Sequence, residues 1–243
     1  NKLKSTLNSA AAELVTIPYL PPATKETLPK FCTGSEPYCL VLDLDETLIH
    51  FEIDETVDPE TEEPGYYLIR PGAIKFLREL SQYYEIVVFT AAMPDVSFTH
   101  FLSLIIFNLD ADWILDNVDR SENISHRLYR QHTTPHEDYA IKDLKNLGRD
   151  LSKTIIIDNL AENFNYTTPL NGIWVESWYD DMDDTVLSLL IPFLKEIVTN
   201  NLDVRDVLTE HIKETFLYGF LEEQKTIPSV LILIEEEKEY KNE

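Results

Sequence analysis

Two aspartates, Asp43 and Asp45, follow an unbroken apolar run and are the residues best placed for chemistry. If the chain stays extended there, both carboxylates face the same side, while Leu44 points away. Two close carboxylates repel each other, so the pair costs stability unless it shares a proton or a cation. An isolated Asp-x-Asp pair is common, however, and its ordinary role is to cap a following helix.

Polar residues end two further apolar runs: Thr90 after one, and Asp158 and Asn159 after the other. Ligands of an open parallel sheet bind beyond the carboxyl ends of its strands, where residues far apart in sequence meet. Carboxylate and amide oxygens, completed by water, suit Mg²⁺. The combination predicts a Mg²⁺ site, although Asp158-Asn159 alone is more typical of a turn and Thr90 alone of a structural strand end.

The elements that must position these residues alternate between strands and helices. Apolar runs are typical of strands buried on both faces; residues 38–42 form an unbroken one, and 84–89, 153–157 and 172–175 are three further, largely apolar segments that predict buried strands. Amphipathic segments between and after them predict helices, the clearest being 71–80, 138–147 and 183–198. The alternation predicts an α/β fold, with a Rossmann-like open parallel sheet flanked by helices.

One helix and one insertion carry more specific expectations. Pro71 is favoured in the first turn of a helix, whose buried stripe would be Ile74, Leu77 and Leu80. The acidic, polar residues 50–66 predict a small hairpin insertion and no large cap domain, which leaves the site open to macromolecules.

The charge balance is strongly acidic. Forty-four acidic residues oppose twenty basic ones, giving a formal net charge of −24. Such a surface repels nucleic acid and attracts basic peptides, so no direct nucleic-acid partner is expected; the excess acid can equally serve solubility alone. The two cysteines, Cys32 and Cys39, show no zinc-site spacing and fit an intracellular protein. No apolar run is long enough for a transmembrane helix.

The first aspartates belong to a longer motif. VLDLDETL after an apolar strand resembles the first motif of the haloacid-dehalogenase superfamily. DLDETL is closest to the branch of small phosphatases acting on the C-terminal domain of RNA polymerase II and their Dullard-like relatives. Later segments resemble further motifs of that branch in the correct order: Phe89-Thr90-Ala91, His126 to Arg130, Ile141 to Asp150, Ile156 to Asn159, and Trp178 to Met182.

The resemblance implies a phosphoserine/phosphothreonine phosphatase that works through an aspartyl-phosphate. Asp43 would attack phosphorus, and Asp45 would be the general acid and then the general base. Thr90, with the backbone N–H of Ala91, would hold a phosphate oxygen, and Lys142 would neutralise phosphate charge.

The resemblance also implies a cofactor and a substrate contact. Mg²⁺ would be held by the Asp43 carboxylate, the Asp45 backbone carbonyl and Asn159, with Asp158 supporting the site or Lys142. Arg130 matches a basic residue that helps to bind the substrate. The substrate would be a phosphoprotein, with the RNA polymerase II C-terminal domain as one candidate, in the nucleus or cytoplasm.

The domain organisation follows from the same resemblance. Residues 1–37 are predicted to form an N-terminal arm, 38–200 the phosphatase domain, and 201–243 a helical extension with an acidic tail that can include a strand from Val230. Residues 96–110 look like an insertion, because the relatives continue from the second motif without it.

Two alternatives remain open. The same branch includes a phosphatase-like receptor of the mitochondrial import machinery that binds basic presequences, which the −24 charge would suit. Such members often lose the catalytic aspartates, however, and both remain here. A phosphatase of small metabolites is less favoured, since no large cap domain is predicted.

Overall fold

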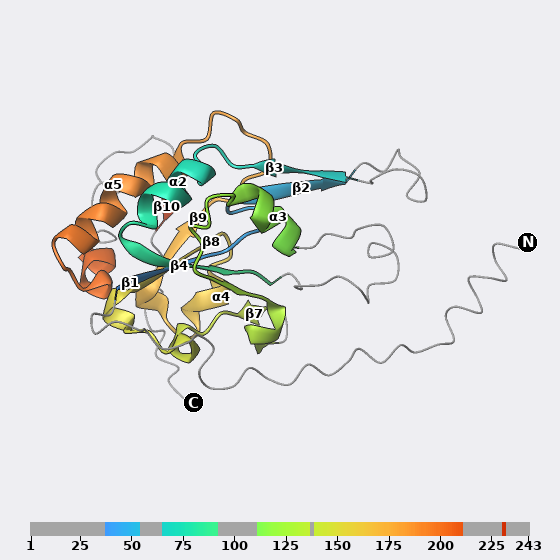
Figure 1. Cartoon of the computed structure of the whole chain (residues 1–243). Coiled ribbons are helices and arrows are strands. Elements are labelled where there is room, and N and C mark those ends of the chain that lie inside the picture. Colours follow the sequence, from blue (N-terminus) through green and yellow to red (C-terminus); the bar gives the residue numbers. More distant parts are fainter. Residues whose placement is uncertain (1–36, 54–64, 92–110, 137–138, 211–229, 232–243) are drawn as a thin grey trace, which may run out of the picture.

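The computed structural model describes residues 37–53, 65–91, 111–136, 139–210 and 230–231. Its centre is a six-stranded sheet in the order β10-β9-β8-β1-β4-β5, in which only β10 runs antiparallel to its neighbour (Figure 1). The strands are β1 (Tyr38–Leu42), β4 (Tyr84–Phe89), β5 (His126–Leu128), β8 (Thr154–Asp158), β9 (Gly172–Val175) and β10 (Val230–Leu231). The predicted α/β class with an open, mostly parallel sheet is confirmed.

Strand β1 lies between β4 and β8 and is buried along its whole length. Val41 lies opposite Val87 of β4 and Ile156 of β8, so the three strands end at nearly the same level. Residues that follow these three strands therefore leave the sheet at one edge and can meet there.

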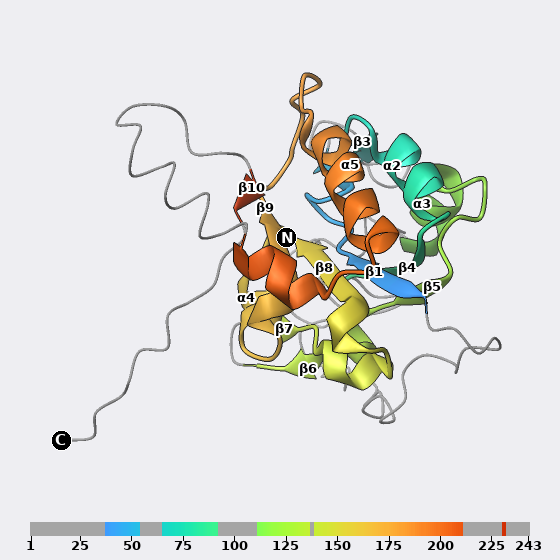
Figure 2. The ribbon, with the colours of Figure 1, turned by 90° about the vertical axis from the view of Figure 1, so that its left-hand side faces the viewer.

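Helices cover both faces of the sheet. Leu40 and Leu42 face a core shared with α2 (Ala73–Leu80), α3 (Ala111–Val118), α5 (Val186–Thr199) and the helical residues 204–210. Cys39 and Val41 face the opposite core, formed with α4 (Glu162–Asn165) and the 3₁₀ turns η2 (Leu144–Leu147) and η3 (Leu151–Lys153). Figures 1 and 2 show these two layers on opposite sides of the strands. Successive side chains of β1 alternate between them, as strand geometry requires.

Two hairpins flank the sheet. The chain leaves β1 into an antiparallel hairpin of β2 (Ile49–Ile53) and β3 (Gly65–Ile69), as expected for the small insertion; the connecting residues 54–64 lie outside the described part. A second hairpin, of β6 (Thr134–Pro135) and β7 (Ala140–Ile141), leads to Lys142.

The helix predicted for residues 138–147 is wrong. Strand β7 and the 3₁₀ turn η2 stand there instead. The Asp143 carboxylate accepts the N–H of Lys145 at 3.1 Å and so starts a tight turn, which ends at Gly148 in the left-handed region (φ 69°). Lys142, predicted to lie on that helix, directly follows β7 and is completely buried.

The buried stripe predicted for the first helix is partly wrong. Helix α2 begins at Ala73, after Gly72 at φ 84°, and buries Ala73, Phe76, Leu77 and Leu80. Ile74 is 53% exposed because it lies beside the stripe that these four residues form, and not within it. Helix α5 confirms the helix predicted for 183–198 and contains Pro192.

The remaining predicted segments are only partly described. Strand β10 pairs with β9, so the tail does add a strand at Val230. The proposed insertion 96–110 and nearly all of the arm 1–37 lie outside the described residues. Among the helices that are described, none is long and apolar enough to cross a membrane.

Candidate functional site

A tight turn follows β1 and folds the DLDET segment back on itself. The Leu44 carbonyl accepts the Leu48 N–H at 2.9 Å, and Glu46 adopts a left-handed conformation (φ 55°) that is uncommon for a residue other than glycine. The turn brings the buried Thr47 hydroxyl within 3.1 Å of Asp43 Oδ2, to which it donates. The turn therefore orients the Asp43 carboxylate through the Thr47 hydroxyl.

Lys142 connects the ends of β1 and β8. Its ammonium donates to Asp43 Oδ1 at 2.5 Å and to Asp158 Oδ2 at 2.7 Å, and its side chain is fully buried. Burial alone would lower the pKa of Lys142, but the charges of Asp158 and Asp43 outweigh it and raise the pKa above its usual value. A positive charge therefore lies beside the candidate nucleophile.

Asp158 is the buried counter-charge of Lys142. Burial raises the pKa of its carboxyl group, and the Lys142 ammonium opposes that rise. The Leu160 N–H donates to Asp158 Oδ1 at 2.8 Å, and Asn163 Nδ2 donates to both carboxylate oxygens at 3.1 Å. The Asp158 carboxylate is thus held in one orientation, in which it contacts the Lys142 ammonium.

Asp45 pairs with Thr90 at the end of β4. The Thr90 hydroxyl donates to Asp45 Oδ2 at 3.0 Å. Burial, and then the neighbouring charge of Asp43, raise the pKa of Asp45 to about 6. A carboxyl group with that pKa can both give and take a proton near neutral pH, as a general acid/base must.

The oxygens at this edge fit Mg²⁺. Asn159 Nδ2 donates to Ser177 Oγ at 3.0 Å, which turns its Oδ1 toward Thr47, 3.5 Å from the hydroxyl that also contacts Asp43. Asp43 and Asn159 therefore present a carboxylate and an amide oxygen to the same space. The described residues contain no group of three or more His, Cys, Asp or Glu side chains suited to a metal, so a Mg²⁺ ion here would need amide, backbone and water oxygens to complete its ligands.

The structure brings together most of the residues singled out from the sequence: Asp43, Asp45, Thr90, Lys142, Asp158 and Asn159. Ala91 follows Thr90 and is half-buried. Arg130 stands apart: it is exposed at the start of the 3₁₀ turn η1 (Arg130–His132), and its guanidinium has no hydrogen bond or ion pair with any described residue.

Three residues of the site were not predicted. Thr47 lies inside the DLDET motif, and that position was the available signal. Asn163 and Ser177 had no signal, because an amide in a short helix and a serine after a strand occur throughout proteins. Their contacts with Asp158 and Asn159 become visible only in three dimensions.

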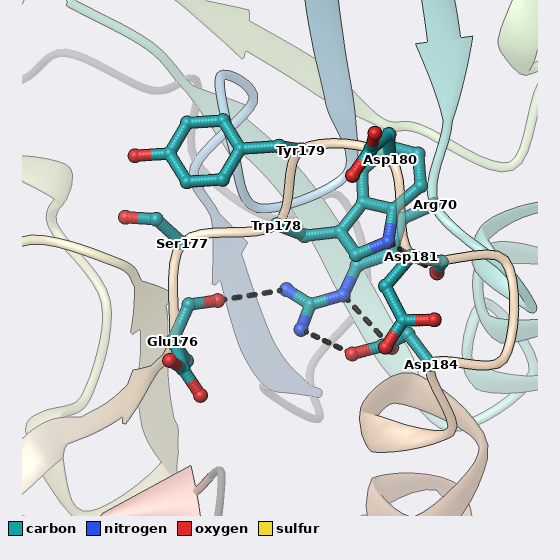
Figure 3. Close-up of a pocket in the computed structure, with 8 residues that line it drawn as sticks. All are labelled: Arg70, Glu176, Ser177, Trp178, Tyr179, Asp180, Asp181 and Asp184. Atoms are coloured by element: carbon teal, nitrogen blue, oxygen red, sulfur yellow. Dashed lines mark hydrogen bonds and ion pairs between the residues drawn. The ribbon is translucent and has the colours of Figure 1, made fainter.

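The buried Arg70 contacts both the turn after β1 and the loop that follows β9. Arg70, 1% exposed, donates through Nε and Nη2 to the two Asp184 oxygens at 3.0 and 2.9 Å. Its Nη1 lies 3.3 Å from the Thr47 carbonyl and 3.4 Å from that of Glu176. Figure 3 shows this guanidinium in the wall of a pocket of about 220 Å³, lined mainly by residues 176–181. The pocket adjoins the candidate Mg²⁺ site through Ser177.

The sequence of this chain is similar to those of known phosphatases. A family model described as "NLI interacting factor-like phosphatase" matches residues 38–205. The CTD small phosphatase-like protein 3 of Caenorhabditis elegans is 36% identical over 211 residues, covering 80% of this chain and 68% of its own length. The human carboxy-terminal domain RNA polymerase II polypeptide A small phosphatase 2 is 36% identical over 169 residues, covering 65% of this chain and 56% of its own.

One solved structure is similar at lower identity. The fission yeast RNA polymerase II CTD phosphatase Fcp1, as an R271A variant bound to beryllium fluoride, is 17% identical, with a TM-score of 0.43, and covers 79% of this chain and 58% of its own. The chain thus spans about half to two thirds of the length of these proteins.

Proposed function

Since this chain belongs to the NLI interacting factor-like phosphatase family, we propose that it is a Mg²⁺-dependent protein serine/threonine phosphatase that forms an aspartyl-phosphate on Asp43. The enzyme class follows from the family and its relatives. The observation that carries the mechanism is the buried Lys142 ammonium, 2.5 Å from Asp43 at the carboxyl edge of the sheet.

In the first step, an Asp43 carboxylate oxygen attacks phosphorus and the bond from phosphorus to the serine or threonine oxygen breaks. A carboxylate and a phosphate dianion repel each other, so the site must supply positive charge. Lys142 supplies one such charge, and its contact with Asp158 keeps the ammonium in place. Thr47 orients the nucleophile through its hydroxyl.

Asp45 handles the proton in both steps. As an acid it protonates the leaving oxygen, and as a base it then takes a proton from the water that attacks phosphorus and releases Asp43. The raised pKa of Asp45, about 6, suits this exchange, and the hydrogen bond from Thr90 orients the carboxyl group.

Thr90 and Ala91 are proposed to hold the phosphate, and Arg130 to contact another part of the substrate. The Thr90 hydroxyl can rotate from Asp45 to a phosphate oxygen, and the Ala91 N–H follows it in the chain. Arg130 has a guanidinium without a partner among the described residues and is proposed to contact the substrate beyond the phosphate.

Mg²⁺ would be held by the Asp43 carboxylate, the Asp45 backbone carbonyl and Asn159 Oδ1. When bound, it supplies Lewis-acid neutralisation of phosphate charge. The excess of carboxylates over the single Lys142 ammonium at this edge supports a divalent cation there.

The substrate is proposed to be a phosphoserine or phosphothreonine protein. The names of the relatives point to the C-terminal domain of RNA polymerase II, or to a similar phosphoprotein, and so to a nuclear or cytoplasmic protein. The small β2–β3 hairpin, in place of a large cap, suits a macromolecular substrate. The receptor alternative gains no support from the site, because both aspartates are kept and paired with Lys142 or Thr90.

A phosphopeptide panel tests the proposal. The wild-type chain should release phosphate from phosphoserine and phosphothreonine peptides in Mg²⁺ and not in EDTA. Asp43→Asn should abolish release while keeping the thermal melt, because Lys142 retains Asp158 as its counter-charge. Turnover by Asp43→Asn above a tenth of the wild-type rate, or full activity in EDTA, would contradict the proposal.

A further inference from the structure

Asn163 contacts both members of the buried Lys142–Asp158 pair. It lies in α4 and is 4% exposed. Its backbone carbonyl accepts the Lys142 N–H at 2.7 Å, and its side-chain Nδ2 donates to both oxygens of Asp158 at 3.1 Å. One residue therefore holds the lysine through its backbone and the aspartate through its side chain.

The Lys142–Asp158 pair has a limited number of hydrogen-bond donors. An ammonium group has three N–H donors. Lys142 gives one to Asp43 and one to Asp158, which leaves one for a phosphate oxygen. Asp158 has two oxygens to satisfy in a fully buried position, and a buried carboxylate without enough donors attracts any that are near.

The Asn163 amide supplies Asp158 with a neutral donor. Without it, the Asp158 carboxylate would keep the Leu160 N–H and would draw a second Lys142 N–H. The ammonium would then move toward Asp158, away from Asp43 and from the space where phosphate must lie.

We propose that Asn163 is a positioning residue, which keeps one Lys142 N–H available for the phosphate by satisfying Asp158. The inference rests on the proposed function, since it assigns the free N–H of Lys142 to a phosphate oxygen. Asn163 acts through Lys142 and does not itself touch the substrate.

Three substitutions separate hydrogen bonding from packing. Asn163→Ala removes the amide and leaves the backbone contact, Asn163→Ser keeps one hydroxyl donor, and Asn163→Asp keeps the shape but places an oxygen against Asp158. Asn165→Ala is the matched control, since Asn165 lies in the same short helix and its buried Oδ1 has no hydrogen-bond partner among the described residues.

Steady-state hydrolysis of p-nitrophenyl phosphate in Mg²⁺ gives the first measurement. We expect kcat/KM to fall about 10- to 100-fold in Asn163→Ala, the range for a hydrogen bond to a charged group. Asn163→Ser should lose less and Asn163→Asp at least as much as Asn163→Ala, whereas Asn165→Ala should stay within about twofold of wild type, since it removes no hydrogen bond. A packing role predicts the reverse order for Asp and Ala, because Asp has the shape of Asn.

Calorimetric titration with tungstate, a phosphate mimic, gives the second measurement and needs no turnover. Tungstate affinity should fall in the same order as kcat/KM. A wild type that binds tungstate but hydrolyses no phosphoester would count against the proposed function and not against Asn163. Wild-type tungstate affinity in a folded Asn163→Ala, or recovery in Asn163→Asp, would overturn the inference; Asn163→Ser supplies the comparison if either variant fails to fold.

Discussion

At the scale of single residues, the site depends on one lysine that the fold buries between two carboxylates. Burying a charge is costly unless it is paired, and removing one partner of a buried pair typically costs about 3–5 kcal/mol. Lys142 has two partners, Asp43 and Asp158, so the charge of Asp43, the proposed nucleophile, can be removed without leaving the lysine unpaired. A substitution at Asp43 can therefore remove activity without a large loss of stability, whereas a substitution at Lys142 should affect both.

Ser177 provides a prediction at this scale. Ser177→Ala removes the acceptor that fixes the Asn159 amide, so Oδ1 would no longer be held toward Asp43. Partners that orient a metal ligand typically contribute about 10- to 100-fold in affinity, and we expect a loss of that size for Mg²⁺. Calorimetric titration with Mg²⁺ measures it.

Ser177→Thr keeps the hydroxyl and is the matched control, with affinity near that of wild type. Equal Mg²⁺ affinity in Ser177→Ala and wild type would show that Asn159 is not a ligand oriented by Ser177.

The sequence predicts those site residues that lie at the ends of strands. Asp43, Thr90 and Asp158 each follow or end an apolar run, and parallel strands end at one edge. Asn163 could not be found in this way, because its partner Lys142 lies on a hairpin 21 positions earlier in the chain. Arg130 is a different case: its side chain is exposed and has no partner among the described residues, so its predicted contact with the substrate stays a prediction.

At the scale of elements, α4 packs against the face of the sheet opposite α2 and α5 and carries Asn163 of the site. Its Phe164 is fully buried beside Gly172, the first residue of β9, and a Cβ at Gly172 would lie 1.8 Å from the Phe164 ring. Asn163 is the preceding residue of α4, so the packing of Phe164 and the position of Asn163 are coupled.

Gly172→Ala should therefore destabilise the protein. Overpacking of a core typically costs about 1–3 kcal/mol, and we expect a loss of that size in chemical denaturation. Gly148→Asn is the control, because a Cβ at Gly148 meets nothing within 4 Å and asparagine tolerates its left-handed φ of 69°. A free energy of unfolding in Gly172→Ala equal to that of wild type would mean that Phe164 moves without cost.

The strands of the sheet could be predicted from the sequence more reliably than the short helical segments. Long apolar runs identify strands because only a sheet covered on both faces buries them completely. The helix expected at 138–147 was wrong because Ile141, Leu144 and Leu147 recur every three residues, a spacing that a 3₁₀ turn satisfies as well as an α-helix. Asp143, which caps the turn, was the residue that could have distinguished them.

At the scale of the whole molecule, the net charge of −24 affects which substrates arrive. A strongly negative surface attracts basic peptides at long range, and added salt weakens this attraction. We expect kcat/KM for a phosphopeptide with Lys and Arg flanks to exceed that of the same peptide with Glu flanks by about tenfold at low salt.

The difference should shrink in about 1 M NaCl, where the Debye length is about 3 Å. A preference that does not change with salt would have to come from direct contacts and not from the overall charge.

The central claim is that phosphate passes through Asp43, and a covalent phosphoenzyme tests it most directly. Asp45→Asn removes the base of the second step, whereas p-nitrophenyl phosphate has a good leaving group and needs little acid in the first. Rapid quench of this variant in Mg²⁺, followed by tandem mass spectrometry, should show close to one phosphoryl group per chain, located on Asp43. Release of p-nitrophenol with no phosphoryl group on Asp43 at any time would contradict the account.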